Sequence, residues 1–338
     1  FPWSKLQLLT MCEQTPNSDI VNLPSTGGDV QAGVEPLSAQ QQLEQLNNFF
    51  EDNYPEIFNS LVTDEGATYK EQSCPVPAQL VDETERMWAR VPDLLAHSSL
   101  LVLGAGLDHR MPHVAYTSQV QAEPWATQHR ALPDGVVGTV VTPPNPTGAV
   151  AVSLHGGPGW FGDGASHDQF WLPLFAAIAE RSGVTIVDLT YPLPGYGSWE
   201  LTQQDVAEAV AQIKAELAPQ AFGLVVFGSG LVAAGQVVGT AMSSALGSDF
   251  ELDFLAALSP RIPEGFAVDI AGLPTAVSLA KFDSRGTAGG VIKKYFAESG
   301  AEVRFYEYDS EHIIAAPAVW RQRVDELAEW LRTVVADC

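Results

Sequence analysis

The stretch Ala149-Val-Ala-Val-Ser-Leu-His-Gly-Gly-Pro-Gly-Trp-Phe161 decides the fold class of this chain. Its first part, residues 149–154, is a short apolar run typical of a fully buried strand, and it ends in His155-Gly-Gly-Pro-Gly159. Glycines there let the backbone turn sharply and leave its N–H groups open to a reacting atom. Such amides can stabilise the oxyanion of an acyl-transfer transition state. The stretch therefore predicts a serine nucleophile, an acid and a histidine further along, in that order.

The composition is that of a large and strongly acidic globular chain. With 338 residues, 46% of them hydrophobic, it is long enough for one α/β domain with an extension and can bury a sizeable core. The net charge of −24 disfavours binding to the phosphates of nucleic acids and adsorption to anionic membranes. No apolar run reaches the length of a transmembrane helix, so we expect no transmembrane segment.

Cysteine usage and the first residue favour an exported protein. Cys12, Cys74 and Cys338 lie in neither a CxxC pattern nor a Cys/His metal-binding spacing. Cys12 and Cys74 lie in irregular polar sequence where a disulfide is expected, although Cys338 could pair with either of them. A chain that starts at Phe1 rather than at methionine suggests either processing or an artificially shortened chain. We therefore expect a secreted or cell-envelope location, with three reduced cytosolic cysteines as the alternative.

The pattern of hydrophobic and polar residues changes near residue 118 and divides the chain there. Residues 1–117 begin with an irregular polar segment and continue with helical spacing over 38–62, interrupted at Pro55, and over 83–97. We expect this part to be an irregular or helical N-terminal extension, or a cap over a site. Residues 118–338 are expected to form an α/β domain.

Strand and helix patterns alternate in that domain. Strands are expected at 118–129, 135–142, 149–154, 184–189, 223–227, 252–258, 275–281 and 302–308, and helices at 168–181, 201–217, 231–245, 287–299 and 318–335. Continuous apolar strands that alternate with helices are typical of a mostly parallel central sheet covered by helices on both faces. The predicted fold class is therefore α/β.

A serine between two glycines follows one of these strands. The apolar run 223–227 leads into Gly228-Ser229-Gly230 and then into a helical pattern. The N-terminus of such a helix supplies free N–H groups and a field that favours negative charge. Ser229 is therefore the candidate nucleophile, and an ordinary turn serine is the alternative.

An acid and a histidine follow at the ends of two later strands. Asp283 and His312 each come just past the end of a predicted strand. Because parallel strands end at the same edge of a sheet, the two side chains can meet Ser229 there. Asp253, inside a strand pattern, and Asp309, just before the histidine, are rival carboxylates.

From about residue 118 to the C-terminus the chain resembles the α/β-hydrolases. The segment His155-Gly-Gly resembles the oxyanion loop of esterases and lipases, and the longer His155-Gly-Gly-Pro-Gly159 also resembles that of proline iminopeptidases. The resemblance implies Ser229 as nucleophile, His312 as general base and Asp283 as the residue that orients the base. It implies neither a metal nor an organic cofactor.

The resemblance also implies where a substrate would lie. The oxyanion donors would be the N–H of Gly230 and an N–H near Gly156 and Gly157. Trp160 and Phe161 are candidates for the substrate-binding wall, with simple packing as the alternative, and the aromatic residues of 191–199 are further candidates. His155 is expected to shape the loop by hydrogen bonding rather than to take part in catalysis.

One part of the family pattern is altered in this chain. The family's turn around the serine reads G-x-S-x-G, whereas here it reads Phe227-Gly-Ser229-Gly-Leu231. Bulky residues replace both outer glycines, while glycines stand at the two inner positions. The departure leaves the fold prediction unchanged, but it makes the exposure of the nucleophile depend on how the turn is built.

These patterns predict a serine hydrolase that cleaves a carboxylic ester through an acyl-enzyme, with a small-molecule, lipid or glycan ester as its substrate. A short acyl group on a cell-envelope glycolipid or polysaccharide is one candidate. A peptidase similar to proline iminopeptidases is the first alternative, suggested by the glycine loop. A non-catalytic hydrolase-fold protein that binds a partner or a lipid is the second, suggested by the altered turn.

Overall fold

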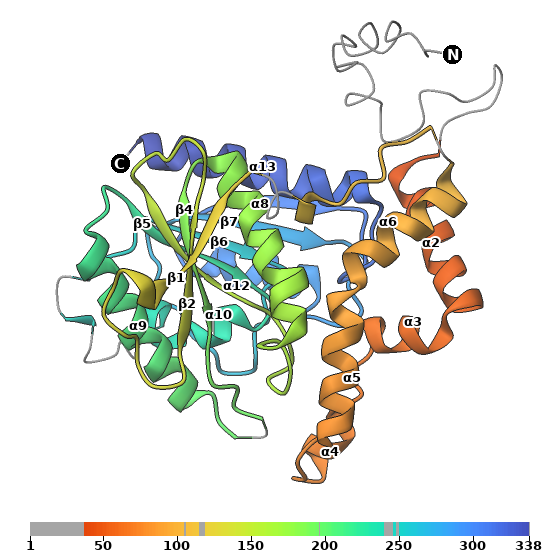
Figure 1. Cartoon of the computed structure of the whole chain (residues 1–338), viewed down its shortest axis with the longest axis horizontal. Helices are drawn as coiled ribbons and strands as arrows, with labels where there is room; N and C mark the ends of the chain where they lie inside the picture. Colours follow the sequence, from red (N-terminus) through yellow and green to blue (C-terminus); the bar gives the residue numbers. More distant parts are fainter. Residues whose placement is uncertain are drawn as a thin grey trace, which may run out of the picture.

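The computed structural model describes residues 37–104, 106–114, 119–195, 197–239, 246–247 and 250–337. An eight-stranded sheet with the order β1-β2-β4-β3-β5-β6-β7-β8 forms its centre (Figure 1). The strands are β1 (Gln121–Pro124), β2 (Val137–Thr142), β3 (Val150–Leu154), β4 (Thr185–Thr190), β5 (Phe222–Phe227), β6 (Phe254–Leu258), β7 (Pro274–Ala280) and β8 (Glu302–Tyr308). Neighbours from β4 to β8 are parallel, and the antiparallel pairs β1–β2 and β2–β4 extend one edge. The predicted mostly parallel sheet is therefore confirmed.

Burial explains how these strands appear in the sequence. Every residue of β3, β5 and β6 is buried, because helices cover both faces of the sheet there. Such strands read as continuous apolar runs rather than as alternating ones. β1 is shorter than the predicted 118–129: it ends at Pro124, which lacks a backbone N–H, and a 3₁₀ turn (Trp125–Thr127) follows it.

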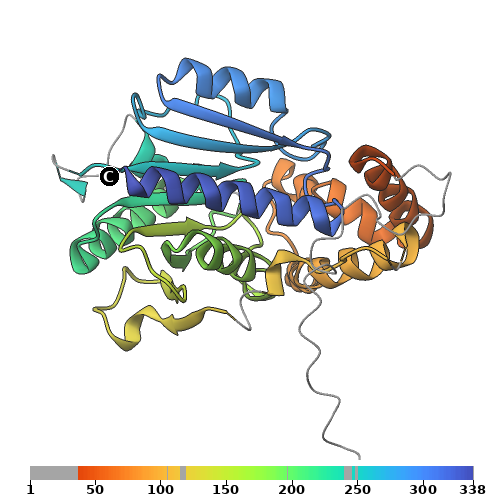
Figure 2. The same cartoon turned by 90° about the horizontal axis from the view of Figure 1, so that it is seen from above.

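Two hydrophobic layers enclose the sheet (Figure 2). The helices α8 (Leu172–Ser182) and α13 (Pro317–Ala336) contribute to one layer, and a π-helical turn (His167–Trp171) leads into α8. The helices α9 (Glu200–Leu217) and α12 (Gly289–Glu298) contribute to the other. The helix expected at 231–245 is instead two short helices, α10 (Gly230–Ala233) and α11 (Gly235–Val238), and residues 240–245 lie outside the described part of the chain.

The N-terminal part is helical and lies beside the carboxyl ends of the strands (Figure 1). Its helices are α2 (Ala39–Asn53), α3 (Pro55–Val62), α4 (Ala67–Glu71), α5 (Ala78–Ala89) and α6 (Val91–Leu103), followed by a 3₁₀ turn (Pro112–Val114). A capping box between Ser38 and Gln41 starts α2, and Pro55 starts α3 at the interruption seen in the sequence. Apart from α4, these helices share one hydrophobic core with α8 and α13. Within the described residues, no helix is both long enough and apolar enough to span a bilayer.

Candidate active site

The turn after β5 carries the predicted nucleophile. Gly228 follows the strand with a left-handed backbone (φ 51°), whereas Ser229 has a right-handed one (φ −71°). α10 begins at Gly230, so Ser229 occupies its N-cap position. Ser229 is the nucleophile that the sequence predicts at this turn. The residue with the left-handed backbone, however, is Gly228, one position earlier.

Asp283 and His312 are brought into direct contact at the ends of β7 and β8. His312 Nδ1–H donates to Asp283 Oδ2 across 2.7 Å, and Asp283 Oδ1 accepts the N–H groups of Arg285 (2.9 Å) and Gly286 (2.7 Å). Burial alone would raise the pKa of Asp283, but its interactions with His312 and with these N–H groups hold that pKa below its usual value. The ionised carboxylate thereby fixes the histidine tautomer that leaves Nε2 available as a base.

The two rival carboxylates are engaged elsewhere. Asp253 accepts the N–H of Phe222 (2.7 Å), at the opposite end of β5 from the corner. Asp309 pairs with the ammonium group of Lys281 (3.1 Å). Asp283 is therefore the carboxylate that orients His312.

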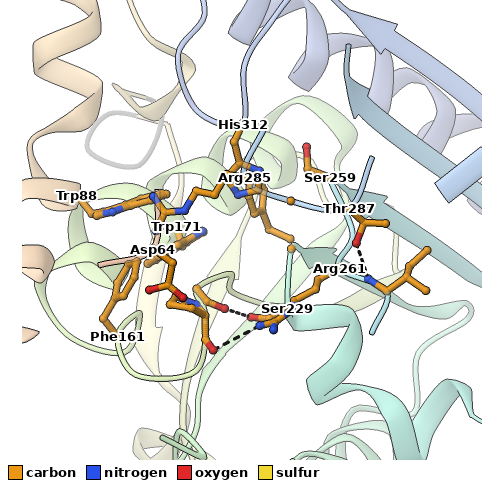
Figure 3. Close-up of a pocket in the computed structure, with 16 residues that line it drawn as sticks. Asp64, Trp88, Phe161, Trp171, Ser229, Ser259, Arg261, Arg285, Thr287 and His312 are labelled. Carbon is orange, nitrogen blue, oxygen red and sulfur yellow. Dashed lines mark hydrogen bonds between the residues drawn. The ribbon is translucent and has the colours of Figure 1, made fainter. Parts of the chain in front are cut away.

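A cavity of about 230 Å³ lies where these strand ends meet the N-terminal helices (Figure 3). Both Ser229 and His312 line it, so the structure brings the predicted nucleophile and base to one site. However, the Ser229 hydroxyl donates to the carbonyl oxygen of Gly157 and not to His312. Within the described residues, Ser229 therefore makes no hydrogen bond to His312, which is the contact expected between nucleophile and base.

The glycine-rich loop after β3 closes tightly on itself and on the corner. Gly157 has a left-handed backbone (φ 122°), and a Cβ there would come within 2.4 Å of the Phe161 carbonyl oxygen. A Cβ on Gly156 would lie 2.9 Å from the Phe227 ring, and one on Gly230 would lie 2.3 Å from a β3 carbonyl oxygen. Only glycine allows these approaches. The N–H groups of Gly157 and Gly230 have no acceptor among the described residues, as oxyanion donors require.

His155 supports the loop, as the sequence analysis expected. Its Nδ1–H donates to the carbonyl oxygen of Gly156 (2.7 Å), and its ring stacks on Tyr191, whose hydroxyl donates to the His155 carbonyl oxygen (2.9 Å). Burial, followed by the nearby His167, lowers the pKa of His155 to about 4. His155 is therefore a neutral structural residue. These contacts hold the Tyr191 side chain against the loop, and Tyr191 does not line the cavity described above.

A buried ionic network lies beneath the same loop. Asp188 on β4 accepts the hydroxyl of Ser153 on β3 (2.5 Å) and a hydrogen bond from His167 Nε2, while His167 Nδ1 bonds to Asp168 (3.0 Å). Burial alone would lower the pKa of His167, but the two carboxylates, Asp188 first, raise it to about 10. His167 is therefore cationic at neutral pH, and its hydrogen bond to Asp188 holds the π-helical turn against the sheet.

The N-terminal helices are bonded directly to the glycine loop. Glu85 on α5 is buried, and its carboxylate accepts the backbone N–H groups of Gly162 (2.6 Å), Gly164 (3.3 Å) and Ser166 (2.8 Å). This irregular segment leaves these backbone N–H groups without backbone acceptors, and the Glu85 carboxylate accepts their hydrogen bonds instead. The extension therefore fixes the backbone next to the proposed oxyanion donors.

Glu85→Gln is expected to lower the free energy of unfolding by about 1–3 kcal/mol, because an amide group replaces one acceptor oxygen and leaves buried N–H groups unpaired. Chemical unfolding of the purified variant measures this loss. Glu83→Gln is the control, since Glu83 is exposed on the same helix, and it should change stability by less than about 0.5 kcal/mol. If the two variants are equally stable, Glu85 does not hold the loop.

The aromatic wall of the cavity differs from the predicted one. Trp160 lies outside the lining, and its Nε1–H donates to Asp64 Oδ1 (3.0 Å) in the N-terminal part, so its assignment as a substrate wall is corrected. Phe161, which was predicted together with Trp160, does line the cavity. Trp171 and Trp88 complete the wall, with their indoles stacked at 5.5 Å. Trp88 escaped the sequence analysis because no local pattern joins α5 to a loop more than seventy residues away.

Two arginines that the sequence analysis did not select also line the cavity. The Arg285 guanidinium lies over the Trp88 ring (5.0 Å) and donates to the Ser60 carbonyl oxygen (2.6 Å). Burial lowers the pKa of Arg285 to about 10, so the group stays cationic at neutral pH. Arg261 donates to the Pro158 carbonyl oxygen (3.4 Å), and it has no ion-pair partner among the residues that the structure describes. The cavity is therefore more cationic than the acidic chain as a whole.

Three solved structures that resemble this chain are esterases. An esterase of the bacterial hormone-sensitive lipase family matches with a TM-score of 0.50 at 15% identity, over 84% of this chain and 99% of that one. A mutant of a further esterase matches at 0.55 and 14%, over 88% and 100%, and a bacterial heroin esterase at 0.50 and 17%, over 82% and 99%. The chain has the α/β-hydrolase fold. No family model matches the sequence, and no curated protein matches it either.

The α/β-hydrolase fold describes the region from β1 to α13. Two further expectations from the sequence, the disulfide and the exported location, stay predictions. Cys74 is exposed and forms no disulfide with another described residue, and its expected partners, Cys12 and Cys338, lie outside the described residues. The predicted disulfide and the exported location are therefore not tested.

Proposed function

We propose that this protein hydrolyses carboxylic esters through an acyl-enzyme formed on Ser229. The observation that carries the proposal is the Asp283–His312 pair, which opens onto the cavity that also holds Ser229. The uncovered N–H groups of Gly157 and Gly230 complete the set of groups that acyl transfer needs. The esterase structures of the same fold support this reaction class.

The reaction begins with a rotation of the Ser229 hydroxyl from the Gly157 carbonyl towards His312. Oγ attacks the ester carbonyl carbon while His312 Nε2 takes its proton, and the backbone N–H groups stabilise the oxyanion. The bond to the alcohol oxygen then breaks, and His312 protonates the departing alkoxide. Water, deprotonated by the same histidine, releases the acid and restores the serine.

The shape and charge of the cavity favour small acyl groups. A volume of about 230 Å³ between aromatic rings is below the range of drug-sized ligand pockets, roughly 300–1,000 Å³, and suits a short acyl chain. This supports a short-acyl ester, such as an acylated envelope glycan or glycolipid, as the substrate class. An aminopeptidase would need free carboxylates for the substrate ammonium, whereas Arg261 and Arg285 line this cavity and Asp64 is bonded to Trp160.

A non-catalytic binding protein is the second candidate function. The hydrogen bond from the Ser229 hydroxyl to Gly157 favours it, because this bond holds the hydroxyl away from His312. A protein of this kind would bind an acyl compound in the cavity without turning it over. The two candidates differ in whether Ser229 reacts.

Fluorophosphonate labelling of the purified protein is expected to modify Ser229, because only a serine activated by a base reacts with such a probe. Peptide mass spectrometry locates the label, and Ser229→Ala should abolish it. Ser259→Ala is the matched control, because Ser259 also lines the cavity but follows β6 rather than β5. A folded protein that takes no label at Ser229 would replace the esterase proposal with the binding one.

A further inference from the structure

The corner between β5 and α10 has room for a side chain that the chain does not provide. Gly228 takes the left-handed conformation (φ 51°) at this corner and lines the same cavity as His312. A Cβ built there would contact only the Cα of Gly156, at an ordinary 3.6 Å. In a strand-to-helix turn of this type, the strained corner residue exposes its side chain above the sheet. A nucleophilic side chain at this corner would therefore have to be that of residue 228.

Ser229, by contrast, is held in the first turn of α10. Its right-handed backbone (φ −71°, ψ −7°) continues into the helix, and its carbonyl oxygen accepts the N–H of Ala233 (3.0 Å). Its hydroxyl donates to Gly157, on the side of the glycine loop. The helix therefore limits how far Ser229 can move its hydroxyl towards His312.

We propose that the nucleophile position of this site is residue 228, and that the glycine there attenuates the enzyme. The inference rests on the proposed ester hydrolysis, because it explains how that reaction is limited. Glycine adopts the left-handed corner without strain, whereas any other residue is strained there. Glycine at position 228 thus avoids backbone strain in the turn, but the hydroxyl of Ser229 is displaced from His312.

Gly228→Ser would supply the missing group in the right place. The introduced Oγ would bond to the ester carbonyl carbon and pass its proton to His312 Nε2. The alcohol oxygen would leave with that proton, and water would then split the acyl ester and restore the hydroxyl. The N–H of Ser229, which has no acceptor among the described residues, follows position 228 and would face the oxyanion with the N–H of Gly157.

The test compares kcat/KM for a short-chain 4-nitrophenyl ester in four proteins: wild type, Ser229→Ala, and Ser229→Ala combined with Gly228→Ser or with Gly228→Ala. The Gly228→Ser combination should exceed wild type by ~100-fold or more, since it places a nucleophile on a preformed base. His312→Ala should abolish that gain. The Gly228→Ala combination carries the same backbone strain without the hydroxyl and should stay at the level of Ser229→Ala. A folded Gly228→Ser combination that does not exceed wild type overturns the proposal.

A matched pair of thiols gives a second readout that does not need turnover. In Gly228→Cys with Ser229→Ala, alkylation by iodoacetamide should report a thiol pKa at least one unit below the usual ~8.5, and His312→Ala should restore it. In Ser229→Cys, whose backbone conformation is ordinary, His312→Ala should raise the thiol pKa by less than half a unit, because the displaced group is only weakly coupled to the base. If His312 lowers the thiol pKa at position 229 by one unit or more, the proposal is overturned even if every variant at position 228 fails to fold.

These results separate the inference from the proposed function. If wild type takes no fluorophosphonate label while the Gly228→Ser combination hydrolyses the ester, esterase activity of the native chain is refuted and the corner assignment stands. If wild type labels at Ser229 and the Gly228→Ser combination gains nothing, the esterase proposal stands and the corner assignment is refuted.

Discussion

Replacing Asp188 by alanine is expected to lower the free energy of unfolding by about 3–5 kcal/mol. The Asp188 carboxylate is fully buried between the Ser153 hydroxyl and the His167 ring. Without it, the buried imidazolium either keeps an uncompensated charge or gives up its proton, and the Ser153 hydroxyl loses its acceptor. Urea unfolding of wild type and Asp188→Ala at pH 7 measures the difference.

Asp168→Ala is the matched control for this prediction. Asp168 also bonds to His167, but its side chain is 74% exposed, against 0% for Asp188. Exposed ion pairs contribute about 0–1 kcal/mol because water screens them. Equal losses from the two variants would contradict the view that burial decides the strength of this network.

The contribution of the same pair should depend on pH. Burial alone would lower the pKa of His167, but Asp188 raises it to about 10, against 6.5 for an unperturbed histidine. The folded state therefore holds a proton that the unfolded state releases, and the stabilisation is full below pH 6.5. It falls by roughly 1.4 kcal/mol per pH unit above that and is lost as the pH passes about 10. A constant difference between wild type and Asp188→Ala across this range would refute the ionic interpretation.

Asp283→Asn is expected to lower kcat by about 10²–10⁴-fold, with little change in KM. An asparagine can present its NH₂ group to His312 Nδ1, which favours the tautomer with the proton on Nε2 and removes the base from the cavity. It also removes the negative charge that stabilises the imidazolium during proton transfer. Steady-state hydrolysis of a short-chain 4-nitrophenyl ester measures the loss, in wild type and in the protein that combines Gly228→Ser with Ser229→Ala.

Asp309→Asn is the control for the effect of charge alone. Asp309 lies between β8 and His312 but pairs with Lys281, so its neutralisation should change kcat less than about twofold. Circular dichroism should show that both variants are folded. An unchanged kcat in Asp283→Asn would mean that the Asp283–His312 pair is structural and not catalytic.

The local patterns of the sequence determine the α/β-hydrolase fold and much of the site. Apolar runs such as β3 and β5 are continuous because they are buried on both faces, so their alternation with helices predicts a parallel sheet. Parallel strands end at one edge, which is why Asp283 and His312 could be paired before any contact was seen. The glycines of the loop after β3 were recognisable because close backbone approaches exclude other residues.

Only the tertiary structure decides which residue occupies the corner and what surrounds it. Gly228 and Ser229 are adjacent. If the strand ended one residue later, Ser229 rather than Gly228 would take the left-handed conformation. That choice depends on how the turn packs, and the residue types do not specify it. Glu85 and Trp88 reach the site from a helix far away in the sequence, through a carboxylate and a ring that match the loop only once both are folded. The sequence thus determined the chemistry available at this sheet edge, while long-range packing decided which groups meet there.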